Sequence, residues 1–188
     1  LKRRRILLAA GIVAAMGLSF AAAETRYLPG DRSISVWFHG AGPGWLEDFM
    51  RGFSWISGTL PMLSLLTAAA MFLVARSYWV HTVAIPMAAA GAGLTPLLKE
   101  LIDRPRPASE LVTVLSNVGG HSFPSGHAFM AMTMFGVLFY LAPQICGPGP
   151  WAVGALRAVL VFAIVAVGAS RVYLGVHWTS DVIGGYLL

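Results

Sequence analysis

Cysteine and charge are both scarce in this chain. Cys146 is the single cysteine among 188 residues. One thiol can form no internal disulfide bond and cannot supply a cysteine-rich metal site. Charged residues make up 11% of the chain, whereas soluble domains carry about 25%. Hydrophobic residues make up 57%, and the mean hydropathy is +0.72. The composition therefore indicates an all-α integral membrane protein.

The positive net charge of +5 does not point to nucleic acid. Four of the cations stand together at residues 2–5, and four more belong to or flank three polar clusters described below. The basic residues form no stripe with interleaved aromatic residues, which nucleic-acid binding would favour. We find no internal repeat and no low-complexity linker. Residues 1–188 are therefore expected to form one transmembrane domain.

Six apolar stretches are candidates for membrane-crossing helices. They lie near residues 6–23, 59–75, 78–98, 128–143, 151–169 and from 178 onward. The first also resembles a signal peptide, with Ala21–Ala23 as a cleavage site. Its apolar run is longer than the usual run of about 7–15 residues, which favours an uncleaved anchor. The last stretch would need about ten more residues to cross a bilayer, so we expect the natural chain to continue past Leu188.

Residues 24–58 are expected to form a surface loop and a short interfacial helix. Between Gly44 and Ser57, apolar residues recur at helical spacing and charged residues fall mostly opposite them. This pattern is typical of an amphipathic helix that lies on the membrane surface. A helix packed on the bundle is an open alternative.

The basic cluster at residues 2–5 predicts the orientation, because such clusters stay in the cytoplasm. Six alternating spans then place residues 24–58, 99–127 and 170–178 on the non-cytoplasmic side. All three polar clusters fall in these segments or at their edges. We therefore expect a protein of the inner (cytoplasmic) membrane whose active site faces away from the cytoplasm.

His177 and Asp181 form the centre of the first cluster. They are four residues apart at the start of a predicted helix and therefore share one face. The carboxylate can accept one ring N–H and leave the other nitrogen free. A neutral histidine held in this way can attack phosphorus directly.

The second cluster is Pro124-Ser125-Gly126-His127, directly before the fourth span. Proline and serine suit a helix start, and glycine allows a ligand to approach the backbone closely. Free N–H groups at a helix N-terminus bind anions. His127 is placed to protonate a leaving oxygen, although a helix cap followed by an incidental histidine is the plainer alternative.

Cations supply the remaining candidates for phosphate binding. Lys99, Arg106 and Arg171 are the predicted clamps, since arginine matches phosphate oxygens and lysine adds a compact charge. Arg104, His121 and Ser170 are candidate flanking residues, and Arg104 has an alternative role as an ion-pair partner of Asp103 or Glu100. No further ligand pattern accompanies His177 and Asp181, so we expect no metal and no cofactor.

Together, in order, these clusters resemble the signature of the type 2 phosphatidic acid phosphatase (PAP2) family. The matching patterns are Lys99-x6-Arg106-Pro107, Pro124 to His127, and Ser170-Arg171-x5-His177-x3-Asp181. The resemblance implies that His177 is the nucleophile, that Asp181 orients it, and that His127 is the general acid. It also implies a metal-independent reaction. The residues that it implies for phosphate binding are Lys99, Arg106, Ser125, Gly126 and Arg171.

We therefore expect a membrane phosphatase that hydrolyses lipid phosphates through a phosphohistidine. Phosphatidic acid, phosphatidylglycerol phosphate and polyprenyl diphosphate are the expected substrates, with the lipid bilayer as the other partner. One alternative is a phosphotransferase that passes the phosphoryl group to another lipid. Another is a non-catalytic lipid-binding protein, although binding alone would need only the cations. The sequence leaves the oligomeric state open.

Overall fold

The computed structural model describes residues 2–40, 42–78, 93–147 and 149–188. These residues form helices joined by loops, and no strand occurs within the described ranges. The predicted all-α class is therefore confirmed. The helices are α1 (Lys2–Glu24), α2 (Asp31–Gly40), α3 (Trp45–Ile56), α4 (Thr59–Ala75), α7 (Leu94–Ile102), α8 (Gly126–Tyr140), α9 (Ala142–Cys146), α10 (Pro150–Tyr173) and α11 (Thr179–Leu187).

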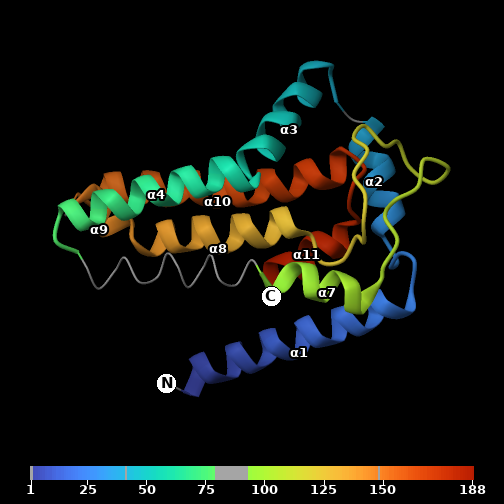
Figure 1. The fold of residues 1–188 in the computed structure, drawn as a ribbon, viewed down its shortest axis with the longest axis horizontal. Coiled ribbons are helices and arrows are strands. Elements are labelled where there is room, and N and C mark those ends of the chain that lie inside the picture. The colour runs from blue at the N-terminus through green and yellow to red at the C-terminus, as the bar shows by residue number, and fades with distance from the viewer. Residues whose placement is uncertain (1, 41, 79–92, 148) are drawn as a thin grey trace.

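The centre of the molecule is a bundle in which α4, α8 and α10 run side by side (Figure 1). Its apolar core includes Met62 of α4, Met134 of α8 and Val167 of α10. α11 packs against α8, and α1 lies along α11 and α7. Burial of this shared core holds together the helices that carry the polar clusters.

Two helices, α1 and α10, are long and apolar enough to cross a membrane. α3 and α4 pass the same test as a pair, although a bend of 58° separates them. α1 leaves large apolar side chains such as Leu8 and Phe20 about 70% exposed. Such a surface is stable in lipid and unfavourable in water. The described helices therefore provide two clear spans, or three with the bent pair.

Local signals account for where the helices begin and end. The Ser125 side chain accepts the backbone N–H of Ala128 and caps α8. α10 begins with Pro150, a residue that fits the first helical position because its missing N–H is not needed there. α7 ends at Asp103, which has a left-handed backbone conformation with φ of 51°.

The predicted spans differ from the helices mainly at their ends. The second span coincides with α4, while the fourth ends earlier than predicted, at Tyr140, and a short α9 follows. The fifth continues past Ala169 to Tyr173 and so includes Ser170 and Arg171. Most of the predicted 78–98 span lies outside the described residues.

The segment 24–58 contains more helix than predicted. The prediction of a surface loop before the interfacial helix was wrong for α2, which begins at the buried Asp31. α3 has the expected amphipathic pattern and also packs against α10. Trp45 and Trp55 on α3 are 64% and 71% exposed. α3 therefore combines the two alternatives, because one face packs on the bundle and the other is exposed.

One end of the bundle carries all three polar clusters (Figure 1). The end of α7, the start of α8, the end of α10 and the start of α11 meet there, beside α2 and the loop of residues 103–125. The start of α1 and the end of α4 lie at the opposite end. The fold thus gathers residues that are far apart in the sequence.

Candidate active site

His177 lies in the short connection between α10 and α11 and is 2% exposed. Its Nδ1 is 3.5 Å from Asp181 Oδ2, and its Nε2 is 3.3 Å from Arg106 Nη1. The first distance is longer than a normal hydrogen bond, as is common for catalytic contacts in a ligand-free site. In the tautomer that donates from Nδ1, the lone pair of Nε2 points towards the Arg106 guanidinium.

Asp181 is held by several donors at once. Its Oδ2 accepts the hydroxyl of Ser122 and the backbone N–H of Trp178, the latter at 2.7 Å. Its Oδ1 accepts Arg104 Nη1 at 2.5 Å. Charge-assisted bonds of this kind keep a buried carboxylate ionised and fixed in position.

The proposed pairing of Arg104 with Asp103 or Glu100 was wrong. The Arg104 side chain is fully buried and pairs with Asp181 and with Asp31 of α2. Asp103 instead lies 2.8 Å from His121, and its side chain is 78% exposed. A buried guanidinium must find buried acceptors, because an exposed carboxylate cannot compensate its desolvation.

Burial decides the protonation state of His177. Desolvation lowers its pKa to about 4, and the charges of Arg171 and Arg106 act in the same direction. Asp181 opposes this shift through its hydrogen bond and its negative charge. The imidazole is therefore neutral at pH 7, the state that nucleophilic attack requires.

Lys99 and Arg106 line the pocket in front of His177. Lys99 donates to the His121 carbonyl at 2.6 Å. Arg106 donates to the carbonyls of Val176 and Gly120 at 2.7 and 3.0 Å. Backbone carbonyls carry no net charge and leave both side chains available to an anion. Burial lowers the pKa of Lys99 to about 8, so its amine is still mainly charged at pH 7.

Arg171 completes the cationic set from the last turn of α10. Its Nη1 donates to the Ser54 hydroxyl of α3, and its buried Nε has no hydrogen-bond partner among the described residues. Within the described ranges, none of Lys99, Arg106 and Arg171 lies within 4.0 Å of a carboxylate. Three neighbouring cations of this kind favour an anionic ligand.

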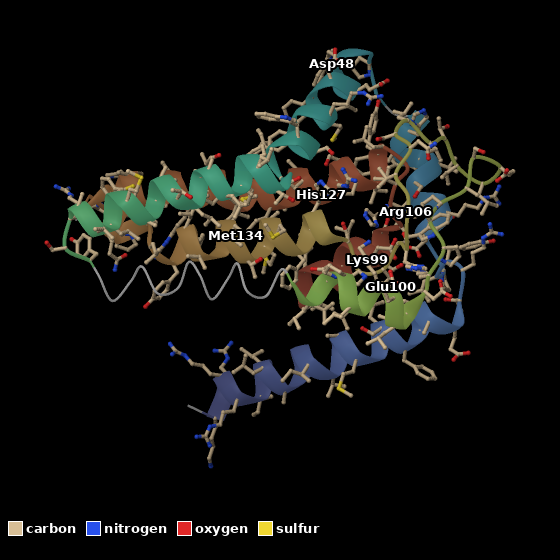
Figure 2. The ribbon with its side chains drawn as sticks, in the orientation of Figure 1. Asp48, Lys99, Glu100, Arg106, His127 and Met134 are labelled. Atoms are coloured by element: carbon tan, nitrogen blue, oxygen red, sulfur yellow. The ribbon has the colours of Figure 1, made fainter. Side chains whose placement is uncertain are left out.

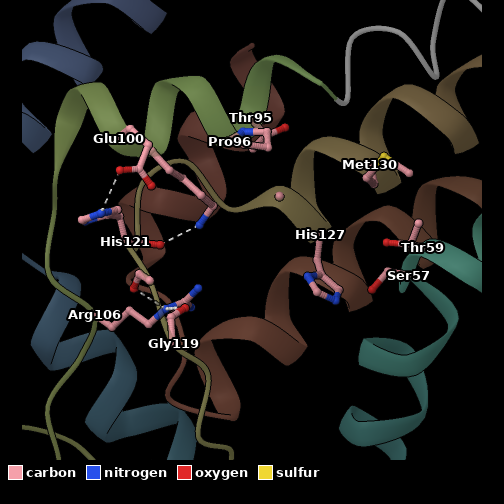
Figure 3. A pocket seen from close by; sticks show the side chains of 13 residues that line it. Ser57, Thr59, Thr95, Pro96, Glu100, Arg106, Gly119, His121, His127 and Met130 are labelled. Atoms are coloured by element: carbon pink, nitrogen blue, oxygen red, sulfur yellow. Dashed lines mark hydrogen bonds and ion pairs between the residues drawn. The ribbon is translucent and has the colours of Figure 1, made fainter.

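The N-terminus of α8 contributes Gly126 and His127 to the pocket (Figure 3). Ser125, by contrast, is buried, and its side chain caps the helix. Its backbone N–H donates to the Asp181 carbonyl at 3.0 Å, which ties the start of α8 to α11. The free N–H groups at this helix end add a positive dipole to the pocket.

The two other flanking candidates occupy different places. His121 lies at the rim of the pocket between Asp103 and Glu100, with its Nε2 3.6 Å from the Glu100 carboxylate. Ser170 is buried and donates to the Val167 carbonyl within α10 at 2.7 Å. His121 therefore borders the pocket, and Ser170 supports the helix end that presents Arg171.

The pocket has a volume of about 530 Å³ and extends beyond the charged residues. Lys99, Arg106 and His127 lie near one another at one end of the bundle (Figure 2). On the other side of His127 the wall is formed by Ser57 and Thr59, at the bend between α3 and α4 (Figure 3). The pocket thus offers a cationic part and a less charged part, separated by His127.

The positive charge of this site comes from its side chains and a helix end. Among the described residues, no group of three or more His, Cys, Asp or Glu side chains is arranged to hold a metal ion. The cations and the α8 N-terminus are the chemistry that these residues can offer to an anion.

Sequence reasoning missed three residues of this site. Asp31, Ser54 and Ser122 contact Arg104, Arg171 and Asp181, respectively. Asp31 follows Pro29-Gly30, a sequence typical of a helix start, and this signal could have identified α2. No local pattern distinguishes Ser54 or Ser122 from other serines.

A protein-family comparison decides the family. The model of the PAP2 superfamily matches residues 79–188, more than half of the chain. The chain belongs to the PAP2 superfamily. It is therefore a phosphatase, and its apolar helices make it an integral membrane protein.

Curated relatives agree with this assignment. The chain is 31% identical over 150 residues to phosphatidylglycerophosphatase B of Bacillus subtilis, which covers 77% of this chain and 70% of the relative. An undecaprenyl-diphosphatase of Sulfolobus acidocaldarius is 43% identical over 68 residues, or 36% of this chain and 28% of the relative. The first of these similarities extends over most of both chains.

Solved structures show the same architecture. The transmembrane PAP2 type phosphatidylglycerolphosphate phosphatase from Bacillus subtilis aligns with a TM-score of 0.82 and 25% identity, over 96% of this chain and 89% of that structure. LpxE of Aquifex aeolicus aligns with a TM-score of 0.65 and 24% identity, over 85% of this chain and 90% of that structure. The helical arrangement is thus that of membrane PAP2 proteins.

Proposed function

We propose that this chain hydrolyses the phosphate headgroup of a membrane lipid through a phosphohistidine at His177. The observation that carries the proposal is the neutral, buried His177, whose Nε2 faces Arg106 in front of a cationic pocket. An anionic phosphate would enter between Lys99, Arg106 and Arg171. Its phosphorus would then face a nitrogen lone pair.

In the first step, Nε2 of His177 forms a bond to phosphorus, and the bond from phosphorus to the leaving oxygen breaks. His127 donates a proton to that oxygen. Burial and the neighbouring cations lower the pKa of His127 to about 3 without a ligand, so His127 would take up this proton as the phosphate anion enters and offsets those cations. Asp181 accepts the Nδ1–H of His177 and stabilises the positive charge that develops on the ring. Lys99, Arg106, Arg171 and the N–H groups around Gly126 stabilise the negative charge on the phosphate oxygens.

In the second step, water attacks the phosphohistidine. His127, now neutral, accepts a proton from the water as the bond between Nε2 and phosphorus breaks. Inorganic phosphate leaves, and both histidines return to their starting states. The same residues would serve a lipid phosphotransferase if a lipid hydroxyl replaced the water, so hydrolysis is a matter of which acceptor reaches the site.

Phosphatidylglycerol phosphate is the substrate that the relatives favour. An alignment over 77% of this chain is to a phosphatidylglycerophosphatase. A polyprenyl diphosphate is the second candidate, because a shorter alignment with 43% identity is to an undecaprenyl-diphosphatase. Phosphatidic acid would fit the same phosphate-binding residues.

The arrangement in the membrane is part of the proposal. Six spans would cross the inner (cytoplasmic) membrane, and residues from 178 onward would belong to the sixth. The basic residues 2–5 would stay in the cytoplasm. The catalytic end of the bundle, which lies opposite the start of α1, would then face the non-cytoplasmic side.

The test is phosphate release from purified protein in detergent, with these three lipids as substrates, each with and without EDTA. We expect release from at least one lipid phosphate, unchanged by EDTA, and inhibition by vanadate. Loss of activity in EDTA that a divalent ion restores would overturn the metal-free mechanism. Transfer of label to an added lipid alcohol, without release of phosphate, would favour the phosphotransferase.

A further inference from the structure

The inference concerns a buried ion network behind Asp181, and none of its members is a signature residue of the three PAP2 clusters. Its members are Asp31 of α2, Arg104 of the loop after α7, and Ser180 of α11. The side chains of Asp31 and Arg104 are 3% and 0% exposed. Buried charges are costly in any protein and more so near lipid, so a network of this kind indicates a function for its members.

Arg104 connects two carboxylates that come from distant parts of the chain. Its Nη1 donates to Asp181 Oδ1 at 2.5 Å, and its Nη2 donates to Asp31 Oδ2 at 3.1 Å. Its Nε donates to the Thr25 carbonyl at 3.3 Å. The planar guanidinium is thus fixed on three sides, which a lysine could not reproduce.

Asp31 acts on the start of α11. Its Oδ1 accepts the backbone N–H of Ser180 at 2.8 Å, and its Oδ2 accepts the Ser180 hydroxyl at 2.6 Å. A carboxylate at this position satisfies a free N–H group in the first turn of α11 and interacts favourably with the helix dipole. Because Asp181 is the next residue, Asp31 also fixes the position of the Asp181 backbone.

The network determines which oxygen of Asp181 faces the nucleophile. Arg104 occupies Oδ1, so that Oδ2 is the atom left beside His177 Nδ1. Ser122 and the Trp178 N–H also bind Oδ2 and resist rotation of the carboxylate. Without Arg104, Oδ1 would be a buried acceptor with no charged partner, and the carboxylate could turn away from the imidazole.

We infer that Arg104 and Asp31 are positioning residues that hold Asp181, and through it His177, in the orientation for attack. The inference rests on the proposed function, in which His177 is the nucleophile. It assigns a catalytic purpose to α2, a helix with no residue in the PAP2 clusters. Neither residue is among those that line the pocket, so both should affect turnover more than binding.

The test uses Arg104→Met, Arg104→Lys and Asp31→Asn in the full chain, with Asp48→Asn as the matched control. Asp48 is exposed on α3, away from the labelled pocket residues (Figure 2). Misplacement of a catalytic group by about 1 Å can cost about 100-fold in rate, so we expect that loss of kcat in Arg104→Met. KM and the inhibition constant of inorganic phosphate should stay within about threefold of the parent, because the phosphate cations remain.

Conservative changes separate positioning from folding. Arg104→Lys keeps the charge and should recover part of the lost kcat, and Asp31→Asn should lower kcat about tenfold. If purified, monodisperse Arg104→Met has the kcat of the parent, the inference is wrong. It is equally wrong if the phosphate inhibition constant weakens as much as kcat falls, since that result would indicate a distorted phosphate site.

A second readout does not depend on activity. Nitrogen NMR of protein labelled in histidine, with His177→Ala to assign the signal, reports which ring nitrogen of His177 carries the proton. We expect the Nδ1–H tautomer in the parent and a mixture of tautomers in Arg104→Met. The same tautomer in both would overturn the inference. A parent that shows the expected tautomer but hydrolyses no lipid phosphate would overturn only the proposed function.

Discussion

His177 lies between a carboxylate and a guanidinium, each beside a different ring nitrogen. Asp181 lies beside Nδ1 and Arg106 beside Nε2. Replacing His177 with alanine removes the proposed nucleophile, so kcat should fall by about 10³-fold or more. Trapping with radiolabelled lipid phosphate should give an acid-labile, base-stable phosphoenzyme in the parent and none in the variant. His39→Ala, which removes an imidazole outside the pocket, is the control and should retain labelling.

The burial of His177 makes a prediction about pH. A pKa of about 4 means that the ring gains its proton only in strongly acidic solution, well below the usual histidine value. kcat/KM should therefore show no loss between pH 7 and 5 that is due to His177, and should fall as pH approaches 4. In an unfolded chain the same ring takes up its proton near the ordinary histidine pKa of about 6.5. The free energy of unfolding should therefore decrease as pH falls from about 6.5 to about 4.

The measurement is kcat/KM for an activated aryl phosphate between pH 4 and 9. A good leaving group needs little help from His127, so the acidic limb reports mainly on the nucleophile. An acidic limb centred near pH 6.5 would mean that His177 is solvated in the working enzyme.

At the scale of single elements, α3 is linked to the phosphate site by one side chain. The Ser54 hydroxyl accepts a hydrogen bond from Arg171 Nη1. Ser54→Ala should raise KM about tenfold, as expected for a hydrogen bond to a charged group of about 1.5 kcal/mol, and should leave kcat nearly constant. Ser64→Ala, whose hydroxyl bonds within α4, is the control. A fall in kcat at constant KM would assign Ser54 to the chemical step.

α11 approaches the start of α8 so closely that it needs glycine. A Cβ on Gly185 would lie 2.6 Å from the Ser125 carbonyl oxygen. Backbone cannot move aside as a side chain can, so Gly185→Ala should cost about 1–3 kcal/mol in the free energy of unfolding. It should also lower kcat, because the Ser125 N–H to Asp181 bond joins the same helices.

Gly154 offers the matched control on α10, since a Cβ there meets no atom within 4 Å. Gly154→Ala should stabilise the protein slightly through helix propensity, by up to about 1 kcal/mol. Thermal unfolding in detergent and phosphate release measure both effects. Equal stability in the two variants would show that α11 can shift without cost.

The sequence allows prediction of elements whose signals are local. The spacing of His177 and Asp181, the cap at Ser125 and the apolar run of α4 each depend on neighbouring residues, and each was predicted. Asp31 and Arg104 meet across more than seventy residues, and no periodicity encodes such a contact. The end of α10 does have a local signal, since Gly175, directly after the C-cap Leu174, has a left-handed φ of 68°.

For the whole molecule, the proposed topology can be tested by labelling. Single cysteines at Ser33 and Asn117, in a Cys146→Ser background, should react with an impermeant thiol reagent in intact cells. Both residues are exposed near the catalytic end. A cysteine at Ser77, beside the end of α4 at the opposite end of the bundle, should react only after lysis. The reverse pattern would place the active site in the cytoplasm.

The contact between Asp31 and Ser180 spans 149 residues of sequence. A ribosome that inserts helices in order releases α2 long before α11 is made. The hydrogen-bond network around Asp181 therefore forms late in biosynthesis, after α7 and α10 have been made. Catalytic competence thus reports that both distant segments have been inserted and joined.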